Sequence, residues 1–440
     1  MQTRSKTVSG LLVRVAWIFS WIYCLNSARG QDYITPSDVM LPPEAASQEA
    51  LDESAAKASL RFLGLDFFPR AAVNVIYDDN ILISSTNNPL SDVRWTLLPG
   101  FAIAAGDLSL FLSGPVTLAE IRSLLNYSLL DDSSRPQRYV GVDYAPAINF
   151  YTENSKYNGV DQIAGLAAGY AFSRLAIGLD QDFFSGDVKN NGVGDLVAES
   201  IFNTRLRFRY ELTDRSDAEI TGQYHALAYE DPRYESYQEF RNEDWYDRLL
   251  GARLQVGLGA AFGLVFPESN PDQTYQQLLV RGLYVVSGKL DLRGTAGIEF
   301  RQYASGQTGT VEPVFTLSAT YQPRISTSFT LEAYRREEPS FAGDYNYISL
   351  GFAAGVRQQL LGRLTASLNA GYDNVNYVLL TSGISNNRSD NYYPIRANLQ
   401  YDVNRHLATT LFFVHLQDAS SIGRYSYVDN MVGARVNWNY

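Results

Sequence analysis

The chain has 440 residues, a formal net charge of −11 and an aromatic content of 13%, with 30 tyrosines and 22 phenylalanines. Its mean hydropathy of −0.18 argues against a bundle of membrane-spanning helices, each of which needs about 20 apolar residues. The acidic balance argues against nucleic-acid binding, which favours a basic surface. A transmembrane β-barrel remains compatible with this composition, because only alternate residues of its strands contact lipid.

Residues 1–30 have the pattern of a secretory signal peptide. A basic start precedes an apolar stretch, and Ala28 and Gly30 are small residues at the spacing of a cleavage site. The apolar stretch is too short for a spanning helix, and a short uncleaved anchor is the alternative. Cleavage after Gly30 removes four cations and the single cysteine, Cys24, and takes the net charge from −11 to −15. The four cations are Arg4, Lys6, Arg14 and Arg29.

Residues 31–66 lack a hydrophobic core of their own. Pro36, Pro42 and Pro43 are followed by a run rich in Ala and Glu over residues 44–58. A segment that buries little apolar surface does not fold by itself. We therefore expect a short periplasmic arm or an insert into the lumen of the following domain.

From Phe67 onward the hydrophobic pattern has a period of two, which is typical of strands. Residues 201–211, 289–303, 363–373 and 393–404 show it most clearly, with one apolar and one polar face. The turn and loop segments that separate these runs predict about 18 antiparallel strands, with about 16 as the alternative. We therefore expect an all-β fold, a transmembrane antiparallel up-and-down β-barrel over residues 67–440.

The end of the chain supports a barrel that lies in lipid. Val432, Ala434 and Val436 share one strand face with Trp438 and Tyr440, whereas the other face is polar. Aromatic side chains near strand ends are typical of the interfacial girdles of membrane proteins. The girdle residues that we predict are Trp95, Trp245, Trp438 and Tyr440.

A soluble β-sandwich would also alternate, and the connections favour the barrel over it. Short links alternate with longer polar ones, which we expect near residues 185–196 and 230–244. Barrels have short periplasmic turns and longer outer loops. Residues 407–416 are apolar on both faces and give no orientation, and residues 108–132 form an irregular periplasmic insert. We expect the Gram-negative cell outer membrane as the location, and membrane lipid and the barrel assembly machinery as partners.

Three short motifs resemble the opening of the beta-barrel porin 2 family of outer-membrane barrels. They are a Tyr-Asp-Asp-Asn hairpin tip at residues 77–80, a Ser-Asp strand start at 91–92 and a Pro-Gly strand end at 99–100. The insert at residues 108–132 departs from the family pattern. The resemblance implies a porin-like role, with some family members near polysaccharide-export machinery, and it implies no catalytic residues.

The polar strand faces are rich in arginine, and they line the lumen if the apolar faces meet lipid. One interpretation is that opposed rows of charge orient polar solutes; the alternative, which we favour for most of them, is that arginines and acids pair across strands. Arg205, Arg207 and Arg209 are the best candidates for solute contact, since three like charges on one face need partners or a solute. The pore-lining residues that we predict are Arg205, Arg207, Arg209, Glu219, Arg293, Glu299, Arg301 and Arg396.

The sequence contains no recognisable catalytic or metal-binding motif. His225, His406 and His415 have no neighbouring serine in a hydrolase motif, and no His/Cys cluster has metal-ligand spacing. Residues 78–80 carry oxygen ligands suited to calcium, but Asp and Asn also favour turns, and we favour a hairpin loop. We therefore predict that the protein is not an enzyme and uses no cofactor.

The leading functional prediction is a porin-like barrel for the passive diffusion of small polar solutes through a charged, Arg-rich lumen. The alternative is an occluded barrel that binds surface polysaccharide or oligosaccharide, or that assists its export. Neither function involves a nucleic-acid partner.

Overall fold

The computed structural model describes residues 60–62, 64–85, 89–106, 138–190, 195–304, 309–340, 345–380 and 388–439. The predicted signal peptide with Cys24, nearly all of the predicted arm, the insert at residues 108–132, and Tyr440 lie outside the described residues. No helix within the described ranges is long and apolar enough to cross a membrane.

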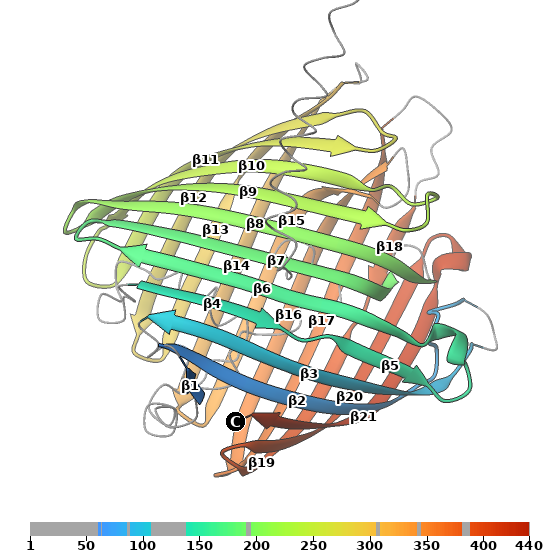
Figure 1. The fold of residues 1–440 in the computed structure, drawn as a ribbon. Helices are drawn as coiled ribbons and strands as arrows, with labels where there is room; N and C mark the ends of the chain where they lie inside the picture. Colours follow the sequence, from blue (N-terminus) through green and yellow to red (C-terminus); the bar gives the residue numbers. More distant parts are fainter. Residues whose placement is uncertain are drawn as a thin grey trace, which may run out of the picture.

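Within these described ranges, twenty-one β-strands form one sheet that closes into a barrel of tilted strands (Figure 1). The first half comprises β1 (Leu60–Phe62), β2 (Leu65–Asp78), β3 (Asp92–Gly106), β4 (Arg138–Tyr144), β5 (Ala147–Tyr151), β6 (Gly159–Ala171), β7 (Leu175–Asn190), β8 (Asp195–Thr213), β9 (Ser216–Tyr229) and β10 (Tyr237–Leu249). The second half comprises β11 (Leu254–Pro267), β12 (Gln273–Ser287), β13 (Leu290–Tyr303), β14 (Thr310–Arg324), β15 (Thr327–Pro339), β16 (Tyr345–Leu361), β17 (Leu364–Leu379), β18 (Ser389–Tyr392), β19 (Ile395–Asn404), β20 (Leu407–Ser420) and β21 (Tyr427–Asn439). Two short 3₁₀ turns are η2 (Ser155–Tyr157) and η3 (Gly423–Tyr425).

The barrel closes because β2 pairs with β21 on one side and with β3 on the other. Two of its positions are each filled by a pair of short strands. Both β4 and β5 pair with β3 and β6, and both β18 and β19 pair with β17 and β20. Since β1 is a three-residue strand folded back on the start of β2, the barrel has 18 antiparallel positions, which confirms the predicted fold.

Two prolines interrupt these divided positions. Pro146 separates β4 from β5, and Pro394 separates β18 from β19. Proline has no N–H group to donate to a neighbouring strand, so the ladder breaks locally without a change of direction. The carbonyl of Pro394 still accepts a hydrogen bond of 3.0 Å from the amide of Gly371.

Aromatic side chains form a ring on the outer surface near the short turns. Each of these side chains is exposed and lies within a few residues of a turn or strand end. The residues are Tyr170, Phe172, Tyr210, Tyr246, Tyr284, Tyr321, Phe329, Tyr401 and Trp438. Such a ring is expected where the periplasmic ends of the strands leave the lipid.

Residues 407–416, which the sequence left without an orientation, belong to β20. Leu411 and Phe413 face outward and are exposed, whereas Val414 and Leu416 are buried inside the barrel. The inner pair packs in a hydrophobic cluster with Ile83, from the connection between β2 and β3. Both faces of this strand are therefore apolar because one meets lipid and the other supports a loop that enters the barrel mouth.

Several strands extend further than the sequence suggested. Residues 185–190 belong to β7, and residues 237–244 belong to β10, although both were expected in loops. The strand β10 was missed because its outward positions are largely polar, which obscures the expected alternation.

Candidate solute site in the barrel lumen

Contacts between strands that are not neighbours identify the inner side of the barrel. Gln273 of β12 and Asn346 of β16 exchange two hydrogen bonds of 3.0 Å. Lys189 at the end of β7 lies 2.7 Å from carboxylate oxygens of both Asp78 in β2 and Asp429 in β21. Such contacts pass through the lumen, because neighbouring strands separate these residues along the wall.

The outer-loop end of the β15–β16 hairpin leans into the lumen. The pairing of β15 with β14 ends at Arg335, whereas its pairing with β16 continues to Pro339. Glu337, in the part that has left the wall, accepts a hydrogen bond of 2.8 Å from the hydroxyl of Tyr303 in β13. The hairpin is therefore buried against the inner surface of other strands and narrows the passage.

Arg301 of β13 holds this hairpin in place. Its guanidinium donates to Glu299 Oε1 at 2.8 Å, to Gln273 Oε1 at 3.0 Å and to the main-chain oxygen of Glu337 at 3.0 Å. The same group lies 4.8 Å from the ring centroid of Tyr275, and Arg301 is only 3% exposed. Arg301 thus faces inward, but its donors are occupied by the protein itself.

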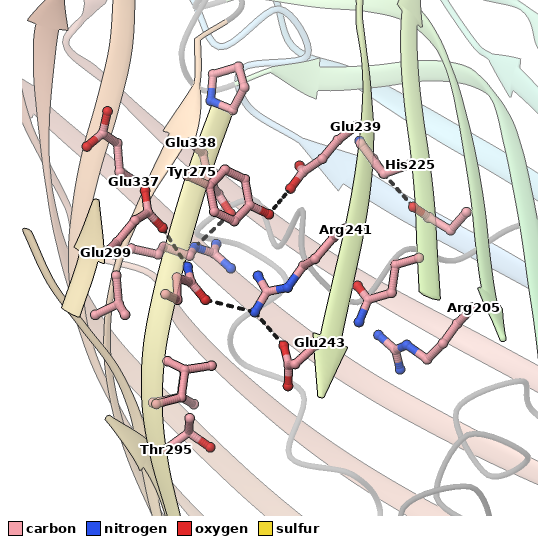
Figure 2. A pocket seen from close by; sticks show the side chains of 18 of the residues that line it. Arg205, His225, Glu239, Arg241, Glu243, Tyr275, Thr295, Glu299, Glu337 and Glu338 are labelled. Atoms are coloured by element: carbon pink, nitrogen blue, oxygen red, sulfur yellow. Dashed lines mark hydrogen bonds and ion pairs between the residues drawn. The ribbon is translucent and has the colours of Figure 1, made fainter. Parts of the chain in front are cut away.

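A cavity of about 310 Å³ lies beside this hairpin, along the inner surface of strands β7 to β15. Figure 2 shows Glu239, Arg241 and Glu243 of β10 on one side, facing Tyr275 and Glu299 on the other. Arg241 donates to Gln277 Oε1 at 3.1 Å and pairs with Glu243 at 2.5 Å, and Tyr275 donates to Glu239. The cavity presents fixed donors and acceptors close together, so it suits a small polar solute.

The predicted arginine row is divided between the cavity and the wall. Arg209 pairs with Asp217 at 2.7 Å, and both side chains are buried. Arg207 Nε lies 3.8 Å from Glu219 Oε1, which also approaches Arg281 at 3.4 Å. Arg207 and Arg209 therefore approach acids across the strands, and Arg205 lines the cavity opposite the buried Asp180 of β7.

Trp245 is not a girdle residue, and the prediction is corrected. It is 4% exposed and faces the lumen, where its ring centroid lies 4.3 Å from the guanidinium of Arg281 and its indole N–H donates to Glu243 at 2.5 Å. Gly259 lies opposite Trp245 on β11, and a Cβ there would lie 2.5 Å from the indole ring. A glycine facing an aromatic residue is the sequence signal that would have identified this packing.

The other predicted residues take the following positions. Trp95 and Trp438 point outward and are exposed at 47% and 40%. Arg293 has an inward position on β13, opposite Ser318, and Arg396 is half-buried on β19, opposite the buried Asn369. These two arginines lie outside the cavity lining.

The histidines occupy three separate environments. His225 is buried on the lumen side and bonds Asn203, His406 lies at the β19–β20 turn, and the Nδ1 of His415 lies 2.8 Å from Asn430 Oδ1. Residues 78–80 form a turn in which the Asn80 amide donates to Asp78 Oδ1 at 3.0 Å. Within the described part of the chain, no group of His, Cys, Asp and Glu side chains has the arrangement of a metal site.

Residues 286–440 match the family model of beta-barrel porin 2. The match covers β13 to β21 and does not include residues 77–100, which carry the motifs of the opening strands. No curated protein matches the chain.

Solved outer-membrane proteins are similar to this chain at low identity. OccAB4 of Acinetobacter baumannii has a TM-score of 0.44 and 9% identity, covering 85% of this chain and 98% of its own. OpdK of Pseudomonas aeruginosa, solved with vanillate, has a TM-score of 0.43 and 10% identity over 85% of this chain and 99% of its own. OprD of Pseudomonas aeruginosa has a TM-score of 0.43 and 11% identity over 88% of this chain and 96% of its own.

The closed barrel, its apolar outer surface and the family match together give the setting of the site. An antiparallel barrel satisfies its backbone hydrogen bonds within the wall, which lipid requires of any spanning sheet. The chain forms an antiparallel β-barrel, its residues 286–440 match an outer-membrane porin family, and the cavity lies inside the barrel.

Proposed function

We propose that the barrel allows small polar solutes to diffuse passively through a narrow, charged lumen. The observation that supports this proposal is the cavity of about 310 Å³, which is lined by Arg205 of β8, Glu239 and Arg241 of β10, Tyr275 of β12 and Glu299 of β13. Arginine offers a rigid fork of donors, and carboxylates only accept hydrogen bonds when ionised. A lumen that carries both favours solutes with donors and acceptors of their own over apolar ones.

The proposal predicts that purified protein conducts ions in planar lipid bilayers. We expect a small and steady single-channel conductance, because the infolded β15–β16 hairpin leaves a narrow path beside it. Swelling of protein-containing liposomes should be faster in small sugars or amino acids than in larger ones. A protein that conducts no ions and gives no swelling would contradict passive diffusion.

The second candidate function is an occluded barrel that binds surface polysaccharide or oligosaccharide. The burial of Glu337 and Glu338 against the inner wall favours it, because a hairpin held in this way restricts large solutes. This candidate predicts binding of polysaccharide by a barrel that stays closed in conductance measurements. Conductance and binding therefore separate the two functions.

The charge of Arg205 should influence ion selectivity. A unit charge about 7 Å from a passing ion contributes about 0.6 kcal/mol in water, which is a factor of about 2.7 in local ion concentration. Because the same charge attracts anions and repels cations, we expect Arg205→Ser to lower the anion-to-cation permeability ratio by about the square of that factor, roughly sevenfold, at low salt, where screening is weak. The reversal potential across a salt gradient measures the ratio.

A matched control for this change is Arg233→Ser, because Arg233 lies in the exposed loop between β9 and β10 and pairs with Asp231. The control should leave the reversal potential almost unchanged. Equal shifts in the two variants would show that Arg205 has no special access to the conducting path.

A further inference from the structure

The outer face of β10 is polar at a depth where the neighbouring strands are apolar. Asp244 points outward, and its partners in register are Ile220 of β9 and Ala260 of β11. Ile220 is 53% exposed, as expected for a side chain that faces lipid. The outward residues of β10, from the loop end to the turn end, are Gln238, Phe240, Asn242, Asp244, Tyr246 and Arg248.

The aromatic residues of the same strand show how deep Asp244 lies. Tyr246 belongs to the aromatic ring near the short turns, and Phe240 packs with Tyr224 and Phe266 at the other end, with ring centroids 4.7 Å and 6.2 Å apart. Aromatic girdles flank the apolar band of a membrane barrel. Asp244 therefore lies between the aromatic ring near the short turns and the aromatic cluster around Phe240, where lipid tails would surround it in an isolated barrel.

Polar groups on the outer face near Asp244 form a surface that we call the β10 patch: Tyr224, Gln238, Asn242 and Asp244, with Phe240 between Gln238 and Asn242. The amide of Asn242 donates to Asp244 Oδ2 at 2.9 Å, and the hydroxyl of Tyr224 donates to Gln238 Oε1 at 3.3 Å. Gly222 lies opposite Asn242, and a Cβ built there would meet no atom within 4 Å. The patch therefore combines hydrogen-bonding groups with open space beside them.

Lipid cannot satisfy these groups. Polar and ionisable side chains on the lipid face of a barrel are costly, most of all near the middle of the membrane. Each carboxylate has about four acceptor positions, and the amide of Asn242 has a second N–H beyond the one given to Asp244. Contact with another protein at the same depth would supply the missing hydrogen bonds.

We propose that the β10 patch is the contact surface between two copies of this chain in the membrane. A second copy inserted in the same direction always presents the same patch at the same depth. A two-fold axis along the membrane normal brings the two patches together, so that the residues of one copy meet those of the other. Each copy then brings an amide donor, Asn242, and a carboxylate acceptor, Asp244, to the shared surface, so that hydrogen bonds between the copies can replace those that lipid does not supply. The proposal is independent of what the lumen transports.

Cysteine cross-linking in outer membranes tests the proposal. The sequence has one cysteine, Cys24, and it lies in the predicted signal peptide. After cleavage of that peptide, an introduced cysteine is the single thiol that can form a cross-link. We expect Ile220→Cys, next to Asp244, to form a cross-linked species of twice the chain mass. Leu399→Cys is the matched control, since Leu399 is exposed on β19. It lies six residues before the turn at Arg405, and Asp244 lies six residues before Leu250 at the end of β10, so the two positions match in distance from the short turns. This control should stay monomeric.

A second pair of variants tests the patch without cysteine. The double change Asn242→Leu and Asp244→Leu should abolish the dimer, measured as mass in mild detergent, while the barrel keeps its heat-modifiable mobility. The matched change Leu399→Asn should leave the dimer intact.

Three results would overturn the proposal. Wild-type protein that is monomeric in mild detergent and uncross-linked at residue 220 would mean that the patch faces lipid. Cross-linking of residue 220 to a product of another mass would identify a different protein as the partner. Equal dimer cross-linking at residues 220 and 399 would mean that the contacts are random.

Discussion

Replacing Arg301 with alanine should widen the channel and weaken the barrel. The change removes the hydrogen bond to the main-chain oxygen of Glu337 and the ion pair with its carboxylate, which are the contacts of Arg301 with the β15–β16 hairpin. It also removes the hydrogen bonds to Glu299 and Gln273, and it leaves the carboxylates of Glu299 and Glu337 buried without this cation. Breaking one partner of a buried ion pair typically costs about 3–5 kcal/mol. We expect a severalfold larger and noisier single-channel conductance, and unfolding at a lower urea concentration.

Arg335→Ala is the control for this experiment. Arg335 also pairs with a carboxylate, Glu312, but both side chains are partly exposed near the point where β15 leaves the wall. Exposed ion pairs contribute only about 0–1 kcal/mol. If Arg301→Ala and Arg335→Ala have the same small effect, the hairpin is held by its other contacts and Arg301 is not its anchor.

Deleting residues 438–440 should prevent assembly of the barrel. Trp438 lies opposite Ala71 in β2 and opposite Leu407 in β20, so the deletion shortens the seam at which the sheet closes. It exposes backbone groups that have no partner in lipid, each of which costs several kcal/mol. We expect no heat-modifiable band and a large loss of protein from the outer-membrane fraction.

The substitution Trp438→Phe separates the backbone effect from the side-chain effect. It keeps the pairing of β21 and an aromatic ring at the interface, so assembly should remain close to that of the wild type. Normal surface levels of the truncated chain would contradict the proposed role of the seam. If the Trp438→Phe variant also fails to assemble, the loss of assembly is caused by the missing indole group rather than by the missing backbone pairing.

The sequence was sufficient to predict the barrel because lipid imposes a pattern on every strand that it touches. A residue on an outward position must be compatible with lipid, and its neighbour on the inward position need not be, so the period of two is visible over most strands. The stretches at residues 201–211 and 363–373 follow this rule, and the structure has 18 antiparallel positions. The terminal strand shows the same rule at its outward Trp438.

The same rule fails on β10, and the failure has a physical cause. Asn242 and Asp244 occupy outward positions, while Trp245 points inward over Gly259. Both faces of this strand are therefore largely polar, and the period of two does not identify the face of Trp245. Only its pairing with the glycine-rich inner face of β11 determines where the indole lies.

The shape of the lumen was also beyond the reach of periodicity. Arg301 and Glu337 lie on strands that are not adjacent, and they meet because the end of β15 has left the wall. Alternation places Arg301 inside the barrel correctly, but it says nothing about whether a hairpin two strands away occupies its donors. The number of free charges in the lumen therefore depends on long-range contacts.

The contact of Lys189 with Asp78 and Asp429 has a consequence for how the barrel forms and opens. The two aspartates belong to β2 and β21, the first and last strands of the ring, and the lysine comes from β7, which is made in between. All three charges can meet only after the ring has closed, so their attraction is absent while the chain is still crossing the barrier to closure. An interaction formed after that barrier slows unfolding and leaves the folding rate nearly unchanged. Lys189 therefore contributes to the lifetime of the closed barrel rather than to the speed of its assembly.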